Sequence, residues 1–442
     1  MRRQTLVLLC LLPTTPALAA GFGLREQSTE AMGEAYAGAA ATASDAGFLA
    51  YNPAAAAGTS GGDFALSAVS IMPGSSANYT TALTAAGTPA GGNAQPKDFI
   101  RNAIIPDIAI RQRLDDRWSV GFSVSVPWGL ATRYPIGWAG RYHGTSTKLT
   151  TINITPVVAY DLAPGFTIGG GIQAQYAKGT LSSAVDIGTL GALSAIPGSV
   201  PGGMDGSSTI NASGWGYGFV LGARAELDDG WTLGASYRSI VHHTLSGSWD
   251  FSLDSAGLGA AIRSATTLLS NTTTKAKVAT PAELQFSLRK QFLERWTFLA
   301  TADWTDWSSF KNLTAVAANP AQPNDVTIAN WKSSWMASVG AEYAATDDLT
   351  LRVGAALDES PAPSATLETR VPDANRTWVA IGATWHATPA MDLKLSFGHL
   401  FDNTRPINQT AAMTGNALRG TLIGTSASNV NVLGLALDYR WQ

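Results

Sequence analysis

The stretch Trp118-Ser-Val-Gly-Phe-Ser-Val-Ser-Val126 alternates strictly between two kinds of side chain. One set consists of tryptophan, phenylalanine and valine, and the other consists only of serine and glycine. A period of two residues is typical of a β-strand whose two faces meet different surroundings. An apolar face opposite a small, polar face is typical of a strand between lipid and a wet lumen. The stretch therefore predicts a membrane-spanning β-strand.

The same alternation returns along the chain, for example over 296–303, 349–358 and 433–441. Short connections rich in Asp, Pro and Gly predict hairpin turns. These turns are expected at 114–117, 162–165, 227–230, 293–295, 346–348 and 387–390. Longer loops alternate with the turns, near 75–100, 130–145, 188–208, 252–272, 311–330, 358–376 and 402–428.

Six turns and seven long loops imply fourteen strands. The sequence thus predicts an all-β fold, a 14-stranded antiparallel transmembrane β-barrel over residues 63–442, with both termini on the periplasmic side. The alternative is a soluble β-repeat protein, which has little reason to place Trp, Phe and Leu on one face of every strand.

Composition agrees with a bacterial outer-membrane barrel. The chain holds 14 Trp, 14 Phe and 11 Tyr, and only 14% of its residues are charged. Aromatic residues gather at both membrane interfaces of such barrels. Acidic residues outnumber basic ones, 32 to 29, which argues against a nucleic-acid partner. We see no run of 18 apolar residues that would predict a membrane helix.

The first residues have the features of a secretory signal peptide. Arg2 and Arg3 precede the apolar run Leu6–Leu12, and Ala17-Leu18-Ala19 offers a cleavage site. We expect residues 1–19 to be removed. Cys10, the only cysteine of the chain, would leave with them, so neither a disulfide nor a cysteine-based metal site is expected.

Residues 20–62 are rich in Gly, Ala, Ser and Thr and precede the first strand. A barrel closes without such a segment, so we predict that it folds inside the lumen as a hatch. It carries four acids, Glu26, Glu30, Glu34 and Asp45, while counting along the strands places Arg352 and Lys394 inside the barrel. Ion pairs between the two could hold the segment, although a solvated pore lining explains the same cations.

Two further features are irregular. Pro127-Trp128-Gly129 follows the cleanest strand and would interrupt its ladder, as a functional kink or as an ordinary strand end. Two loops are unexpectedly apolar and spaced as in helices, which predicts a ligand groove or a mutual cap. Their residues are Leu190, Leu193 and Ile196 in one loop, and Leu258, Ile262 and Leu269 in the other.

A series of short motifs covers the whole predicted mature chain. The motifs are Ala20-Gly21-Phe22-Gly23-Leu24, Gly33-x-Ala35-Tyr36-x-Gly38, Asp45-Ala46-Gly47, Asn52-Pro53-Ala54, Pro127-Trp128-Gly129-Leu130, Pro281-Ala282-Glu283, Trp304-Thr305-Asp306-Trp307, Asp358-Glu359-Ser360-Pro361 and Pro372-Asp373-x-Asn375-Arg376. Taken in this order, the series resembles the FadL-type long-chain fatty acid transporters of the outer membrane.

The resemblance implies how the parts work. Phe22 and Asn52-Pro53-Ala54 would belong to the hatch, and Pro127-Trp128-Gly129 would form a kink that opens the wall sideways. The two apolar loops would form the ligand groove. Fatty-acid members are expected to hold the carboxylate with cations, but the matching positions lie near Ser183 and Thr327. Lys178, Arg238 and Arg352 are therefore the candidate headgroup cations, whereas hydrocarbon transporters of the family need none.

The predicted function is passive, hatch-gated outer-membrane transport of long-chain fatty acids or other hydrophobic molecules by lateral diffusion through the barrel wall. The alternatives are uptake of neutral aromatic or aliphatic hydrocarbons and a general diffusion porin. A barrel hydrolase is a third class, with Ser246 close to His243, but no orienting third group is evident and we expect no enzyme activity. Expected partners are the hydrophobic ligand, outer-membrane lipid and lipopolysaccharide. We expect a monomer, with no metal and no cofactor.

Overall fold

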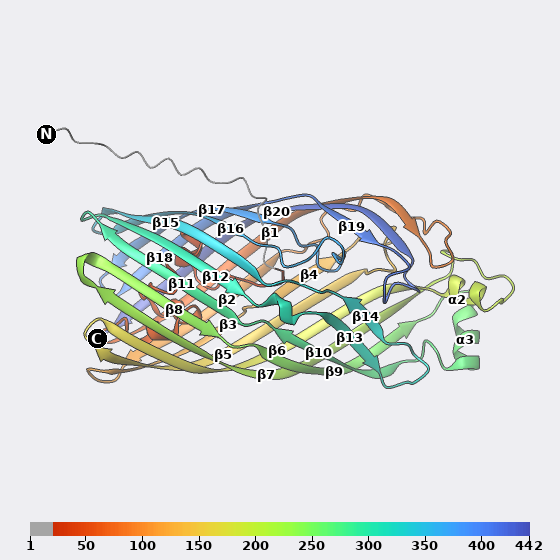
Figure 1. Cartoon of the computed structure of the whole chain (residues 1–442), viewed down its shortest axis with the longest axis horizontal. Helices are drawn as coiled ribbons and strands as arrows, with labels where there is room; N and C mark the ends of the chain where they lie inside the picture. Colours follow the sequence, from red (N-terminus) through yellow and green to blue (C-terminus); the bar gives the residue numbers. More distant parts are fainter. Residues whose placement is uncertain (1–20) are drawn as a thin grey trace.

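A computed structural model describes residues 21–442, and the predicted signal peptide lies outside this range. One sheet closes on itself because β1 pairs with both β2 and β20, all antiparallel (Figure 1). The strands are β1 (Gly62–Leu83), β2 (Ala103–Arg113), β3 (Trp118–Ser125), β4 (Gly129–Arg133), β5 (Ser146–Ala163), β6 (Phe166–Asp186), β7 (Asp205–Leu227), β8 (Trp231–Arg238), β9 (Val241–Ser252), β10 (Thr272–Thr280), β11 (Glu283–Phe292), β12 (Trp296–Thr305), β13 (Asn312–Ala317), β14 (Asp325–Ile328), β15 (Ser334–Thr346), β16 (Leu349–Asp358), β17 (Arg376–Thr388), β18 (Met391–Asp402), β19 (Arg405–Gln409) and β20 (Thr421–Trp441).

These twenty segments make fourteen barrel strands, because six barrel strands are each interrupted once. The interrupted strands are β3 with β4, β8 with β9, β10 with β11, β12 with β13, β14 with β15, and β18 with β19. The predicted 14-stranded antiparallel barrel is thus confirmed. Figure 1 shows the C-terminus at the end with the short turns, and the helices α2 (Ile187–Leu193) and α3 (Leu258–Thr266) at the other end.

The two faces of the wall follow the predicted alternation. In β3, Trp118 and Phe122 are exposed on the outside, whereas Ser119 and Ser123 are buried inside. Outward aromatic rings meet near the short turns, where the Trp118 and Tyr160 ring centroids lie 4.6 Å apart. Such rings form the interfacial belt expected of a barrel in a bilayer. Among residues 21–442, no helix is both long enough and apolar enough to cross a membrane.

Several regions expected as loops are strands. β1 continues to Leu83 and pairs with β20 from Thr421 onward, and β13, β14 and β19 lie wholly inside predicted loops. These strands extend past the region of apolar alternation. Where both faces of a strand are polar or mixed, the alternation that identifies a membrane strand disappears, so the sequence alone predicts a loop.

The residues before β1, numbered 21–61 and here called the N-terminal segment, are almost entirely buried. The segment contains α1 (Thr29–Gly33) and the short 3₁₀ helices η1 (Ala46–Ala50) and η2 (Pro53–Ala57). α1 contacts β1, β16, β17, β18 and β20, while η2 contacts β2, β3, β5, β6 and β7. Because these strands lie around most of the barrel, the segment crosses its lumen.

Side-chain caps explain why such a Gly- and Ala-rich segment folds. Ser28 accepts from the Ala31 amide at 3.3 Å, and Asp45 accepts from the Gly47 amide at 2.6 Å. Asn52 caps η2 through the Ala54 amide at 2.9 Å, with Pro53 at the first helical position. These caps stabilise short helices that would not persist alone in water.

The segment lies so close to the wall that some strand positions must be glycine. A Cβ atom added to Gly354 in β16 would lie 2.0 Å from the carbonyl oxygen of Glu34. Gly234 in β8 meets the Ala40 carbonyl oxygen in the same way, at 2.1 Å. Backbone atoms on both sides leave no flexible side chain to yield, so these glycines position the segment.

We predict that Gly354→Ala displaces α1 and destabilises the packing of the N-terminal segment by about 1–3 kcal/mol, as overpacking does elsewhere. Hydrogen–deuterium exchange of the 28–42 amides should become faster. Gly170→Ala is the matched control, since its added Cβ would lie at an ordinary 3.5 Å from its nearest neighbour. Identical exchange in the two variants would contradict the close approach.

Candidate transport site

An apolar cavity, here called the outer cavity, lies inside the barrel next to the N-terminal segment. Its volume is about 1040 Å³, counted out to its open mouth. Its apolar lining includes Leu130, Leu149, Ile210, Leu245, Phe310 and Trp331, with Phe22 of the N-terminal segment. Apolar residues of different strands therefore build most of the lining, which suits a hydrophobic molecule, and the charged residues Lys148, Glu368 and Arg370 also line the cavity.

Arg370 lines the outer cavity from the loop 359–375. Its side chain is buried, and one Nη donates to the Ser182 carbonyl oxygen at 3.2 Å. Its Nε has no hydrogen-bond partner, and among residues 21–442 no carboxylate forms an ion pair with it. Burial lowers the pKa of Arg370, but a guanidinium stays protonated in proteins, so the cavity wall holds a cation that the Asp325 and Glu368 carboxylates attract without forming an ion pair with it.

The acids closest to Arg370 already have a partner. Asp325 and Glu368 both form ion pairs with Arg419, and the Glu368 contact measures 3.7 Å. Arg419 comes from the loop 410–420, so it connects that loop to Asp325 of β14 and to Glu368, which lines the cavity from the loop 359–375. Arg370 remains the charged group that is free to receive a ligand anion.

The three cations predicted from sequence lie elsewhere. Lys178 is exposed on the outer face of β6. Arg238 forms an ion pair with Glu283 at 3.1 Å and donates to the Ala50 carbonyl oxygen. Arg352 is buried between acids of the N-terminal segment. None of the three lines the outer cavity, whereas Thr327, at the position matching a family cation, does so as a neutral residue.

The hydrogen-bond ladder of the wall is interrupted where the kink was predicted. β3 ends at Ser125 and β4 begins at Gly129. β2 pairs with β3 only from Ile108 onward, so its residues 103–107 pair with β1 alone. Pro127 lies inside the break and has no amide hydrogen to donate. The wall is therefore unpaired over a short length between its second and third strands.

The N-terminal segment covers this break from inside. The Leu24 amide donates to the Pro127 carbonyl oxygen at 2.8 Å, and the Gly129 amide donates to the Phe22 carbonyl oxygen at 2.9 Å. Gly23 and Trp128 form the antiparallel bridge between these two bonds. Residues 22–24 thus act as a short extra strand, here called the patch.

Aromatic rings surround the patch. The Phe22 ring lies 4.6 Å from that of Trp307, 5.5 Å from that of Trp331 and 6.1 Å from that of Trp128, measured between centroids. Phe22 also lines the outer cavity. One side chain consequently separates the cavity from the break in the wall.

The other three predicted hatch residues, Asn52, Pro53 and Ala54, lie at contacts between the N-terminal segment and the barrel wall. Asn52 caps η2 and donates to the carbonyl oxygens of Ala40 at 2.6 Å and Ala223 at 3.0 Å. Pro53 and Ala54 pack against Gly169 of β6, where a Cβ would lie 2.5 Å from the Ala54 amide nitrogen. This motif fixes one side of the segment to the wall.

The residues predicted to form a groove mostly pack against each other. Leu190, Ile196, Leu258, Ile262 and Leu269 belong to one hydrophobic cluster near α2 and α3, and Leu193 is 64% exposed. The cluster shares Ile210 and Ala315 with the outer cavity. The six residues therefore lie above the cavity, and in the described chain their packing matches a cap more closely than an open groove.

His243 and Ser246, the pair named for a hydrolase, lie on opposite faces of β9. His243 is buried with its Nε2 3.0 Å from the Gln175 Oε1, whereas Ser246 is exposed. The strand geometry keeps the histidine ring away from the serine hydroxyl.

We predict that Phe22→Ala weakens the attachment of the patch by about 3–5 kcal/mol, because it removes a buried ring. Hydrogen exchange at the Leu24 and Gly129 amides should become faster. Phe292→Ala, which removes an outward ring 53% exposed, is the control. Unchanged exchange in Phe22→Ala would show that the ring does not hold the patch.

Comparisons with known proteins agree with this geometry. The long-chain fatty acid transport protein of Escherichia coli K12 is 26% identical, over 96% of this chain and 97% of its own. A solved FadL homologue of Pseudomonas aeruginosa has the same fold, with a TM-score of 0.88, 24% identity and coverage of 96% and 100%. The toluene transporter TbuX of Ralstonia pickettii superposes with a TM-score of 0.64, 18% identity and coverage of 95% and 99%. The sequence profile of one family matches residues 10–441, and the chain belongs to that family, the outer membrane protein transport proteins (OMPP1/FadL/TodX).

Proposed function

We propose that this outer-membrane protein transports hydrophobic molecules that carry an anionic headgroup, with long-chain fatty acids as the best fit. The observation that carries the proposal is the position of Arg370, a buried cation without an ion pair among residues 21–442, in the wall of a mostly apolar cavity. The name of the Escherichia coli relative supports the same ligand class.

Both the apolar lining of the cavity and Arg370 would contribute to the binding of a fatty acid. An acyl chain gains roughly 0.8 kcal/mol for each CH₂ removed from water. A carboxylate at Arg370 would gain a charge-assisted hydrogen bond, which is stronger than one between neutral groups. The carboxylate would also give the buried Arg370 charge a partner, which lowers the free-energy cost of its burial.

The route follows from the order of the parts. A ligand in the outer cavity contacts Phe22, and beyond Phe22 lie Trp128 and the unpaired stretch of wall. Movement of the patch would let the ligand pass sideways into the bilayer without crossing water. In this proposal residues 20–62 are the hatch, and Pro127, Trp128 and Gly129 form the lateral opening. Transport is passive, driven by partition of the apolar chain.

Uptake of neutral hydrocarbons is the second candidate, since most of the cavity is apolar and the fold matches that of TbuX. It leaves the Arg370 cation without a role. A general diffusion porin fits poorly, because the N-terminal segment is buried across the lumen.

The closed wall of the barrel bears on its oligomeric state and on its contacts with lipid. A closed sheet has no free edge to pair with another chain, which supports a monomer. The outward apolar band would contact outer-membrane lipid and lipopolysaccharide directly.

We predict that purified protein binds oleate more tightly above the pKa of its carboxyl group than below it. Arg370→Met should weaken oleate binding about tenfold to a hundredfold, because a hydrogen bond to a charged group contributes ~1.5–3 kcal/mol. Toluene and hexadecane binding should not change in that variant.

Arg295→Met, which changes an arginine in an exposed short turn, is the control. If Arg370→Met binds oleate as the wild type does, the carboxylate does not bind at Arg370. If only the neutral ligands bind, and pH has no effect, the protein is a hydrocarbon transporter.

A further inference from the structure

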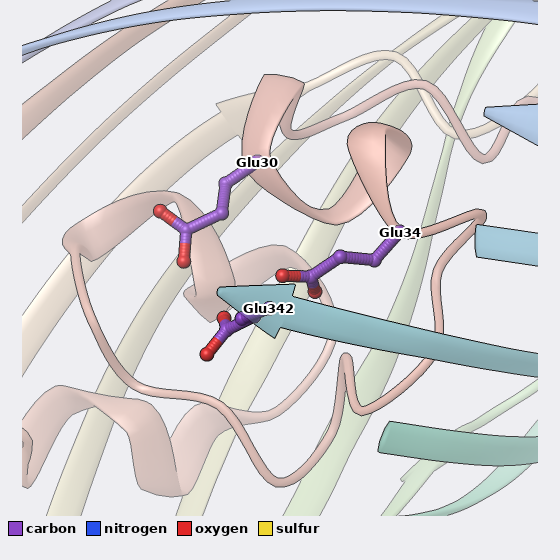
Figure 2. A group of neighbouring side chains, drawn as sticks. All are labelled: Glu30, Glu34 and Glu342. Carbon is purple, nitrogen blue, oxygen red and sulfur yellow. The ribbon is translucent and has the colours of Figure 1, made fainter. Parts of the chain in front are cut away.

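Three buried glutamates meet where the N-terminal segment touches the wall. Glu30 and Glu34 come from α1 and its C-cap, and Glu342 comes from β15 (Figure 2). The ligating oxygens of their carboxylates all lie within 4.8 Å of one another. Like charges at this distance in a buried site repel strongly unless something compensates them.

Cations of the wall compensate them in part. Arg352 contacts Glu34 at 2.8 Å, Glu30 at 3.2 Å and Glu342 at 3.6 Å. Arg289 forms a bidentate pair with Glu342, at 2.9 and 2.5 Å. One guanidinium thus lies among all three carboxylates, in the place that a metal ion would need, so the geometry does not support a metal site.

Lys394 connects this cluster to more acids. It binds Glu30 at 2.6 Å and also pairs with Asp45 of the segment and Asp438 of β20. Five carboxylates therefore share three cations. The charged groups are Glu30, Glu34, Asp45, Glu342 and Asp438 on one side, and Arg289, Arg352 and Lys394 on the other.

At the contact between α1 and β15, the shortage of cations falls on Glu34. Its side chain is fully buried, and its Oε2 has no hydrogen-bond partner among the described residues. Burial, and then the adjacent Glu342, raise the pKa of Glu34 well above the ordinary 4.5 of a glutamate. Glu30 behaves differently, because Arg352 and Lys394 outweigh its burial and lower its pKa.

We propose that Glu34 and Glu342 share one proton, and that this proton is a latch that keeps the N-terminal segment seated in the lumen. The proposal rests on the hatch role proposed above and adds its regulation. When the proton leaves to solvent, two carboxylates face each other across Arg352. Their repulsion acts between α1 and β15, and so it pushes the segment away from the wall.

The direction of the pH effect follows from linkage. The seated state binds the proton more tightly than an unseated state, in which Glu34 has its ordinary pKa. Seating is therefore fully favoured below pH 4.5 and weakens as pH rises through the seated pKa of Glu34. Within that window the seating equilibrium changes by about tenfold per pH unit, for one proton.

Conductance of the purified full protein in planar bilayers, without any hydrophobic ligand, tests the latch between pH 4.5 and 9. We expect the wild type to be nearly silent at the low end and to open increasingly often as pH rises. Glu34→Gln keeps an acceptor for Arg352 but removes the second negative charge, so it should stay silent throughout. Glu342→Gln provides a second test from the wall side, in case Glu34→Gln does not fold.

Asp161→Asn is the matched control, since Asp161 pairs with Arg113 at 2.7 Å and neither residue belongs to the cluster. It should show the wild-type rise. A flat wild-type profile, or a rise that persists in Glu34→Gln and Glu342→Gln, would overturn the latch. Neither result bears on ligand choice, which the oleate measurement tests separately.

Discussion

The lipid interior offers no hydrogen bonds, so every backbone group of a membrane wall must find a partner within the protein. This constraint closes the sheet between β1 and β20. It also makes the interruption at Pro127 costly, because residues 103–107 of β2 pair with β1 but have no partner on the side of β3. The patch meets that cost from inside, with two backbone hydrogen bonds. In the transport that we propose, the rest of the structure supports this short piece of wall, which would move aside.

The patch and the rest of the N-terminal segment are attached to the barrel wall by different kinds of contact. Its body is held by glycine contacts, by caps and by buried ion pairs to Arg352 and Lys394. The patch is held by two backbone bonds, by the Phe22 ring, which also faces the outer cavity, and by Leu24 packed on Gly129. A ligand in the cavity therefore contacts the patch before the body of the segment. A change in the proton content of the ion cluster would instead act on the body.

The sequence predicted those features that depend on periodicity. The alternation of six short turns with seven long loops indicated fourteen strands. The period of two placed Arg352 and Lys394 inside, where they do meet acids of the N-terminal segment. Arg370 was missed because it lies in a loop, where counting residues does not tell which way a side chain points. Lys178 and Arg238 were selected by position, but the first points outward and the second is paired. The apolar spacing in the loops 188–208 and 252–272 identified contacts correctly, but spacing cannot distinguish a groove from a cap.

The central claim is that ligand leaves through the wall beside the patch. Gly23 and Trp128 form a narrow antiparallel pair, which suits a disulfide, and the only native cysteine is Cys10. The measurement is oleate uptake by cells carrying Gly23→Cys with Trp128→Cys, compared before and after reduction of the same protein. The account predicts that uptake stops in the oxidised protein and returns on reduction. Equal uptake in the two states would contradict lateral exit at this place.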